Sequence, residues 1–296
     1  MSEAEVLSIV AADGYHLACR RYAPSDGHRR LGLVVYLHGI QSHGGWYDAS
    51  SRRLAEAGFT VYLPDRRGSG LNAADRGHGE SWEQLAADMV AVESRALAEA
   101  AEAAVRLPLM LVGVSWGGKL AAALAAMHGG RYAALALLCP GICPQRDVSL
   151  GTKLRIAAAL AGKRGRQRFP IPLDDPGLFT ATPRWLEFLA RDRLTLHEAT
   201  ARFLFESRRL DATVAAMAPW IRVPTWLALA GRDRIIDNDR TLAWLCRLGA
   251  SERTARLYPT AHHTLEFEPQ CEAIFDDLAT WLADQAERHI SKATRL

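Results

Sequence analysis

The sequence of 296 residues has no long hydrophobic run. None of its apolar stretches approaches the roughly 18 residues that a membrane-spanning helix needs. Its start, MSEAEVLSIV, lacks the positive charge and the extended apolar stretch of a secretory signal peptide. We therefore expect a soluble, cytoplasmic protein.

Cysteine is scarce and scattered. The chain has five cysteines, of which only Cys139 and Cys143 are close, and their C-x-x-x-C spacing fits neither a redox motif nor a zinc site. We expect buried or inert thiols. The ten histidines are scattered as well, and the adjacent pair His262 and His263 lacks the spacing to chelate one ion. Because a phosphate-binding glycine loop is also missing, we expect no metal and no cofactor.

A strong excess of one charge is missing too. The 36 basic and 33 acidic side chains leave a formal net charge of +3, which is too small to indicate a nucleic-acid partner. The remaining composition, with 49% hydrophobic and 23% charged residues, is that of an ordinary globular protein with a large core. The sequence leaves the oligomeric state open.

Short apolar runs alternate with longer helical patterns. The apolar runs 32–39, 59–65, 108–113 and 132–140 predict strands buried on both faces, and the runs 222–231 and 254–259 predict two further strands. The helical patterns lie at 50–57, 81–104, 116–128, 238–248 and 270–286. This alternation predicts an α/β protein in which a mostly parallel sheet carries helices on both faces.

The alternation is lost between residues 141 and 219, where the pattern is helical and interrupted by prolines. Such a long connection predicts a helical lid, 141–219, inserted between two parts of the core, 1–140 and 220–296. Segment 153–169 combines an apolar helical patch with six basic residues. It is either a solvated lid surface over an apolar pocket or a site of peripheral contact with an anionic membrane.

The motif Gly113-Val114-Ser115-Trp116-Gly117 stands between an apolar strand and an alanine-rich helix. This context predicts a sharp turn that raises the serine hydroxyl above the edge of the sheet. The first N–H groups of a helix lack intrahelical acceptors, so the Trp116 amide is a candidate donor to a substrate oxyanion. Ser115 is the candidate nucleophile, and a passive serine in a glycine-rich turn is the alternative.

The motif HGI closes the first parallel strand at the same edge of the sheet, where open α/β sheets bind ligands. The amide of Ile40 is the expected second donor of an oxyanion hole. We expect His38 to brace this loop rather than to act as a base. In the motif DRRGSG, we expect Arg66 or Arg67 to bridge loops rather than to bind substrate.

A serine nucleophile needs a base, and the base works best when a carboxylate orients it. Asp233 is the first carboxylate after strand 222–231, ahead of Asp237 and Asp239, so it is the preferred acid. The base follows the last strand, where His262 and His263 are adjacent. Adjacent side chains point in different directions, so the pattern requires one histidine without selecting it.

Five motifs occur in order along the chain: HGIQSHGGWY, DRRGSG, GVSWGG, GRDRIID and HHTLEFEP. With them the sequence resembles, over nearly its whole length, the monoacylglycerol lipase and lysophospholipase group of α/β-hydrolases. The resemblance implies Ser115 as nucleophile, Asp233 as acid, and the amides of Ile40 and Trp116 as oxyanion donors.

The resemblance also selects the base. In that group a glutamate follows the catalytic histidine by five residues, and Glu268 stands five residues after His263. The implied function is a serine hydrolase that cleaves a carboxylic ester, such as a monoacylglycerol or lysophospholipid, through an acyl-enzyme on Ser115. The same residues serve thioesterases, acyltransferases and C–C bond hydrolases, and a non-catalytic ligand-binding protein of this fold is a further alternative.

The lid carries no motif that identifies the substrate. Its apolar and aromatic side chains are expected to form mostly the core of the lid, above a pocket suited to an acyl chain. They are Leu178, Phe179, Trp185, Phe188, Leu189, Phe203, Leu204 and Phe205.

Overall fold

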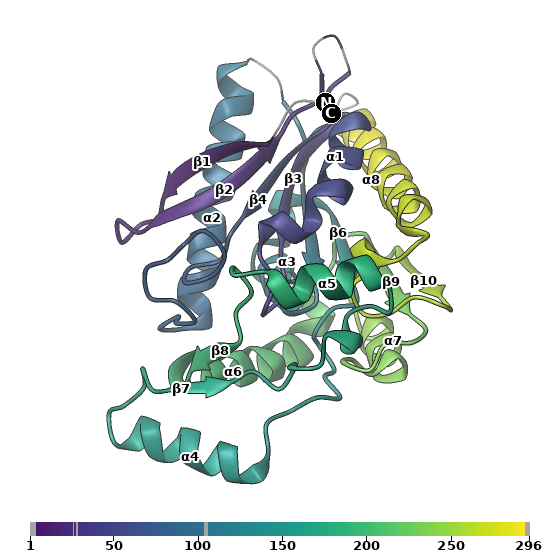
Figure 1. Cartoon of the computed structure of the whole chain (residues 1–296). Helices are drawn as coiled ribbons and strands as arrows, with labels where there is room; N and C mark the ends of the chain where they lie inside the picture. Colours follow the sequence, from purple (N-terminus) through teal and green to yellow (C-terminus); the bar gives the residue numbers. More distant parts are fainter. Residues whose placement is uncertain (1–3, 26, 28, 104–105, 294–296) are drawn as a thin grey trace.

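The computed structural model describes residues 4–293 except 26, 28, 104 and 105. Its central feature is an eight-stranded sheet in the order β1-β2-β4-β3-β5-β6-β9-β10 (Figure 1). The strands are β1 (Glu5–Val10), β2 (His16–Tyr22), β3 (Gly32–Leu37), β4 (Phe59–Pro64), β5 (Leu109–Val114), β6 (Tyr132–Leu138), β9 (Thr225–Ala230) and β10 (Arg253–Tyr258).

The sheet is parallel from β4 to β10 and antiparallel at the β1 and β2 edge. Every residue of β3, β4, β5, β6 and β9 is buried, which explains why these strands are continuous apolar runs. All six predicted strands are confirmed. Strands β1 and β2 are not among them, because both are partly exposed and polar residues interrupt their apolar pattern.

Helices cover both faces of the sheet (Figure 1). Helix α1 (Asp48–Glu56) packs against α8 (Cys271–Ala293), while α2 (Trp82–Glu102) packs against α3 (Trp116–His128), and α7 (Asn238–Cys246) packs on β9 and β10. The helices confirm the predicted pattern, although the range 81–104 predicted for α2 extends to Ala104, outside the described residues.

Residues 141–219 lie between β6 and β9, toward the carboxyl ends of the parallel strands (Figure 1). They contain helices α4 (Leu150–Ala161), α5 (Pro183–Arg191) and α6 (Ala201–Met217) and a small antiparallel pair, β7 (Arg168–Pro170) with β8 (Glu198–Thr200). The pair was not predicted, because three residues are too few to show a period of two.

An aromatic cluster holds this segment on the sheet domain. The Trp185 ring of α5 stacks on Phe267 with ring centroids 4.4 Å apart, and Phe179 meets Trp46 edge-on at 5.7 Å. Phe188 contacts the same group. Rings in these geometries add to the stabilisation that comes from burial alone. Across the described residues, no helix has the length and apolarity required to cross a membrane.

Candidate active site

Ser115 occupies a strained turn between β5 and α3. Its φ of 50° and ψ of −121° lie in a region that side-chain-bearing residues rarely adopt, at a cost of about 1–3 kcal/mol. A Cβ at Gly117 would overlap the carbonyl oxygens of Leu37 and His38, so the chain can approach this closely only with glycine. The turn packs the start of α3 directly against the end of β3.

His263 joins Ser115 to Asp233. The Nε2 atom of His263 lies 2.9 Å from the Ser115 hydroxyl oxygen, and its Nδ1 atom lies 2.7 Å from Oδ2 of Asp233. The side chains of His263 and Asp233 are 2% and 0% exposed, so water does not compete for these hydrogen bonds. An ionised carboxylate accepts only, which places the imidazole proton on Nδ1 and leaves Nε2 free to accept the serine proton.

The second carboxylate oxygen of Asp233 is held by the backbone. Its Oδ1 accepts hydrogen bonds from the amides of Ile235 at 2.7 Å and Ile236 at 3.1 Å. These bonds fix the orientation of the carboxylate toward the histidine. Asp237, the alternative acid, caps the first turn of α7 by accepting from the Arg240 amide at 2.9 Å.

His262 faces away from the serine. Its Nδ1 atom lies 3.2 Å from Oε1 of Glu268. Glu268, whose spacing selects His263 in the sequence, therefore contacts the neighbouring histidine. The structure brings Ser115, Asp233 and His263 together and keeps His262 apart.

The amides of Ile40 and Trp116 are both unoccupied donors. Among the hydrogen bonds of the described residues, neither N–H has an acceptor. The Ser115 carbonyl, which shares a peptide unit with the Trp116 amide, accepts from Gly118 at 2.9 Å and Gly141 at 2.7 Å. Because C=O and N–H point in opposite directions across a trans peptide, these bonds fix the direction of the Trp116 N–H.

His38 braces the Ile40 loop, as predicted. Its Nε2 accepts the Arg66 amide at 2.8 Å, and its Nδ1 donates to the Gly39 carbonyl at 2.8 Å. Burial and the nearby Arg66 guanidinium lower the pKa of His38 to about 3, so the ring stays neutral. The bridging role predicted for Arg66 or Arg67 is also confirmed, since Arg66, which follows β4, donates to the carbonyls of Gly39 and Ile40 in the loop after β3.

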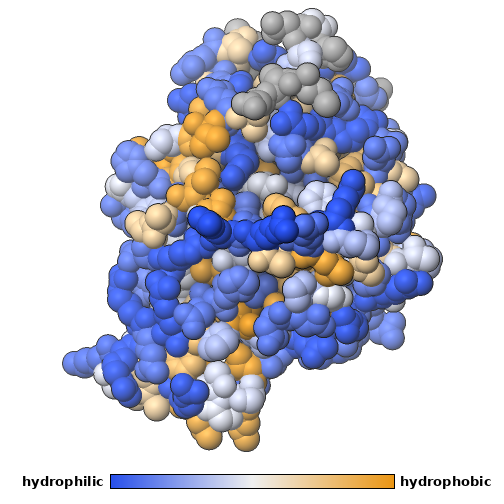
Figure 2. All heavy atoms as spheres, viewed as in Figure 1, coloured by the Kyte–Doolittle hydropathy of each residue, from blue (hydrophilic) through white to orange (hydrophobic). Residues whose placement is uncertain are grey.

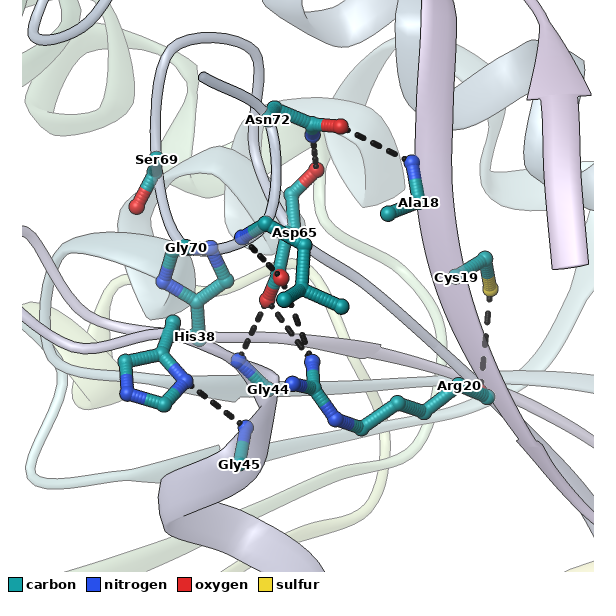
Figure 3. A network of polar contacts seen from close by, with 12 residues as sticks. Ala18, Cys19, Arg20, His38, Gly44, Gly45, Asp65, Ser69, Gly70 and Asn72 are labelled. Carbon is teal, nitrogen blue, oxygen red and sulfur yellow. Dashed lines mark hydrogen bonds and ion pairs between the residues drawn. The ribbon is translucent and has the colours of Figure 1, made fainter. Parts of the chain in front are cut away.

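A carboxylate network fixes the same loops (Figure 3). Asp65 accepts the Gly44 amide at 2.6 Å, the Leu71 amide at 2.8 Å and the Arg20 guanidinium at 3.1 Å. Asp65 is not among the functional residues that the sequence pattern predicts. The sequence feature that could have indicated Asp65 is its position directly after a buried strand, at the edge where the site residues lie.

A cavity of about 750 Å³ opens beside Ser115. Ile40, Trp116 and the 141–219 segment form its walls, so both amide donors lie in its lining. Of the apolar lid positions identified in the sequence, only Leu204 and Phe205 line it. The other apolar lining residues of the segment are Pro144, Val148, Ile156, Ala157, Leu160, Ile171, Pro172 and Leu173.

Lys119 is a buried lining residue that the sequence did not reveal. Its side chain is 5% exposed, and its Nζ lies 2.5 Å from Asp211 and 2.9 Å from the Ser207 hydroxyl. Burial lowers the pKa of Lys119, while Asp211 opposes that shift. The sequence feature that could have indicated Lys119 is its position one helical turn after Ser115.

One group of three potential metal ligands occurs within the described part of the chain. The side chains of Cys139, Asp233 and His263 have ligand atoms within 4.8 Å of one another. Asp233 already bonds His263, which in turn bonds Ser115, so this arrangement matches proton transfer better than ion binding.

Comparisons with known proteins agree with this geometry. A family model described as serine aminopeptidase S33 matches residues 28–270. The monoacylglycerol lipase of Mycolicibacterium smegmatis is 25% identical over 257 residues, which cover 85% of this chain and 88% of that protein. Human monoglyceride lipase is 23% identical over 282 residues, which cover 94% of this chain and 90% of that protein.

The fold is shared with a solved lipase structure. A soluble variant of monoglyceride lipase from Saccharomyces cerevisiae, in complex with a substrate analog, superposes with a TM-score of 0.85 at 17% identity, over 96% of this chain and 97% of that one. The resemblance and fold class expected from the sequence are confirmed. The chain therefore belongs to the serine aminopeptidase S33 family of α/β-hydrolases and is an enzyme, a hydrolase resembling lipases and esterases.

Proposed function

We propose that the protein is a serine carboxylester hydrolase that acts on monoacyl lipids or similar esters through an acyl-enzyme. The observation that carries this proposal is the hydrogen-bonded series from Asp233 through His263 to Ser115, which opens on an apolar cavity. Each member sits at the end of a different strand or loop on one edge of the sheet. This is the arrangement that nucleophilic acyl transfer requires.

In the proposed mechanism, the Ser115 oxygen attacks the ester carbonyl while His263 Nε2 takes the serine proton. The carbonyl oxygen becomes an oxyanion, which accepts from the amides of Ile40 and Trp116. Collapse of this intermediate breaks the bond to the leaving alcohol, and the imidazolium of His263 donates its proton to that alcohol. A water molecule then attacks the acyl-enzyme by the same steps and releases the acid.

The cavity supports a substrate with an apolar chain. Its volume of about 750 Å³ falls in the range of small-molecule sites, and aliphatic side chains make up much of its lining. The similar proteins from Mycolicibacterium smegmatis and humans are named as lipases of monoacylglycerols or monoglycerides. We therefore propose a monoacylglycerol, a lysophospholipid or a comparable single-chain ester.

The charges of the cavity disfavour an aminopeptidase, although the family description names one. A peptide substrate would bring a terminal ammonium, which an unpaired carboxylate would have to receive. The two carboxylates of the lining are already paired, Asp147 with Lys153 at 2.6 Å and Asp211 with Lys119 at 2.5 Å. The lining also contains Arg146, Arg202 and Arg208.

Substitution of Ser115 tests the proposal. Ser115→Ala should lower kcat/KM for a short-chain ester by at least about 10³-fold, because the nucleophile is gone while binding and the oxyanion hole remain. A fluorophosphonate probe should label the wild-type protein and the Ser207→Ala control, but not Ser115→Ala. Turnover by folded Ser115→Ala, or a wild-type protein that neither reacts with the probe nor cleaves any ester of graded chain length, would reject the assignment.

We further propose that residues 141–219 act as a lid that contacts an anionic membrane. Helix α4 exposes Leu150 and Leu154, with exposed fractions of 74% and 64%, next to a basic stretch. Figure 2 shows apolar groups at this lower end of the molecule, beside hydrophilic ones. Exposed leucines flanked by lysine and arginine favour the interface of an anionic bilayer.

A further inference from the structure

Arg66 is a buried cation without an acidic partner. Its exposed fraction is 4%, and among the described residues no carboxylate oxygen lies within 4.0 Å of its guanidinium. Within the described part of the chain, its Nε atom also has no hydrogen-bond acceptor. A buried charge that lacks a counter-charge is destabilising, because the interior solvates it poorly. A folded protein that keeps such a charge needs a compensating role for it.

The guanidinium holds the loop that contains Ile40. One of its terminal nitrogens donates to the Gly39 carbonyl at 3.0 Å, and the other donates to the Ile40 carbonyl at 2.9 Å. The Gly39 carbonyl and the Ile40 amide belong to one peptide unit, which has no cis geometry. Since C=O and N–H point in opposite directions, a carbonyl fixed toward Arg66 turns the Ile40 N–H away from Arg66.

Arg66 also contacts the second amide donor through its side chain. The guanidinium carbon lies 4.8 Å from the ring centroid of Trp116 and 5.1 Å from that of Phe203. Cation–π contacts at these distances hold the charge in place without neutralising it. The same group therefore supports both residues that offer amides to the cavity.

The nearest carboxylate along the chain serves another cation. Asp65 precedes Arg66, but its side chain points to Arg20 and to the Gly44 amide (Figure 3). Arg67, the next residue, is paired with Asp88 at 2.7 Å and Asp13 at 2.9 Å. Two adjacent arginines thus differ in one respect: only Arg66 keeps an uncompensated charge, and it does so behind the Ile40 peptide.

We propose that Arg66 is a positioning residue of the oxyanion hole, which aims the Ile40 N–H at the substrate oxygen and supplies the positive charge that complements the oxyanion. This inference rests on the proposed function and deepens it. The negative charge arises when the serine oxygen bonds to the carbonyl carbon, the C=O π electrons move to oxygen, and the serine proton passes to His263. Arg66 touches none of these atoms and acts through the Gly39–Ile40 peptide.

The size of the effect follows from distance. The path from the guanidinium across one peptide to a hydrogen-bonded oxygen is roughly 8 Å. At an effective dielectric constant of about 20, a unit charge at this distance changes the rate by a factor of about 30. Ground-state esters carry no such charge, so KM should change much less than kcat.

The test compares a trifluoromethyl ketone with the matching secondary alcohol. The ketone forms a tetrahedral adduct with the serine and carries an oxyanion, whereas the alcohol has the same chain and no charge. In Arg66→Met we expect kcat for a short ester to fall about 30-fold and the Ki of the ketone to rise by a similar factor. The Ki of the alcohol should stay within about threefold of the wild-type value.

Arg67→Met is the matched control, measured below its melting temperature. It removes a guanidinium from the same loop and leaves Asp88 unpaired, so it should unfold at a lower temperature with an unchanged ratio of the two Ki values. Arg66→Lys keeps the charge but not the paired donors, and we expect an increase of about 3- to 10-fold in the ketone Ki.

An unchanged ketone Ki in Arg66→Met, or equal increases for ketone and alcohol, would overturn the proposal, because the second result is what a merely loosened site produces. If Arg66→Met does not fold, a wild-type ketone Ki in Arg66→Lys overturns it. A wild-type protein that forms no adduct with the ketone refutes the proposed esterase function instead, before any Arg66 variant is made.

Discussion

The loops at the carboxyl edge of the sheet differ sharply from the 141–219 segment that covers them. At the sheet edge, buried polar groups have defined partners: Asp233 accepts three hydrogen bonds, and Asp65 joins two loops to β2. In the segment, α4 exposes leucines, and several ion pairs, such as Arg166 with Asp75, lie at the surface. At the sheet edge, several hydrogen bonds fix the orientation of each of these carboxylates, whereas the segment exposes apolar and charged side chains at the surface.

This difference has a physical cause. Strand ends and tight turns leave backbone N–H and C=O groups unpaired, so side chains near them can be fixed by several short hydrogen bonds. The segment is held on the sheet domain by aromatic packing through Trp46, Phe179, Trp185 and Phe267, and by partly buried hydrogen bonds such as those of His43 and Trp46 with Asp192. Packing of that kind specifies where the segment lies but not which ester enters the cavity below it.

The largest expected difference in activity is between variants of two residues at the sheet edge, His263 and His262. His263→Ala removes the group that accepts the serine proton and should lower kcat/KM by at least about 10³-fold. His262→Ala removes only a contact with Glu268 and should leave kcat/KM within about threefold of wild type.

Hydrolysis of a short-chain ester by both purified variants measures this contrast, with circular dichroism to verify that each is folded. Glu268 is buried, with its side chain 4% exposed, so His262→Ala is expected to melt at a lower temperature. Equal losses of activity in the two variants would contradict the proposed base.

The sequence predicted the sheet edge far better than the segment. Strands buried on both faces are continuous apolar runs, which are easy to recognise in a sequence. The motifs that follow parallel strands lie at one edge of the sheet, because the carboxyl ends of these strands all lie there. The sequence pattern and the resemblance together therefore predicted that Ser115, Asp233 and His263 lie at this edge. The position of Glu268 beside His262, rather than His263, depends on the exact turn of the loop, which spacing alone does not give.

The cavity lining could not be predicted for a related reason. Most aromatic side chains of the segment were expected to form core rather than to line the pocket, and Trp185 and Phe188, which pack against Phe267, do not line the cavity. The cavity is instead lined by less conspicuous residues such as Ile156 and Leu173. Which apolar residues face a pocket and which form the core depends on how short helices pack, and periodicity does not record that.

The buried edge should also respond to pH through Glu266. This side chain is fully enclosed and accepts the Ser50 amide at 3.0 Å, at the start of α1. Burial raises the pKa of Glu266 to about 7 from a value of 4.5. Between these values the folded state binds more protons than the unfolded state, so the free energy of unfolding falls as the pH rises, by about 3 kcal/mol in total.

Glu266→Gln keeps the acceptor for Ser50 and cannot ionise, so it should lose this part of the pH dependence. Urea unfolding of both proteins at pH 5, 6, 7 and 8 measures the difference, which should be smallest at the lowest pH and should favour the variant most at the highest. Parallel curves would show that Glu266 does not titrate in this range.

The smallest expected effect is on membrane binding by the 141–219 segment. Ester hydrolysis should not change. Leu150→Ser combined with Leu154→Ser removes two exposed apolar side chains from α4. We expect binding to vesicles of phosphatidylglycerol and phosphatidylcholine to weaken by about tenfold at low salt. The hydrolysis of a water-soluble ester should stay within about twofold of wild type, since neither leucine lines the cavity.

Leu257→Ser is the matched control, because Leu257 is 54% exposed on the edge strand β10, away from α4. It should bind the vesicles like the wild-type protein. Raising the salt concentration should release all of the proteins that bind, since surface charges are screened over a few ångströms at high ionic strength. Sedimentation with the vesicles gives the bound fraction. If the wild-type protein does not sediment with anionic vesicles at low salt, or if the α4 and β10 variants lose binding equally, α4 is not the membrane contact.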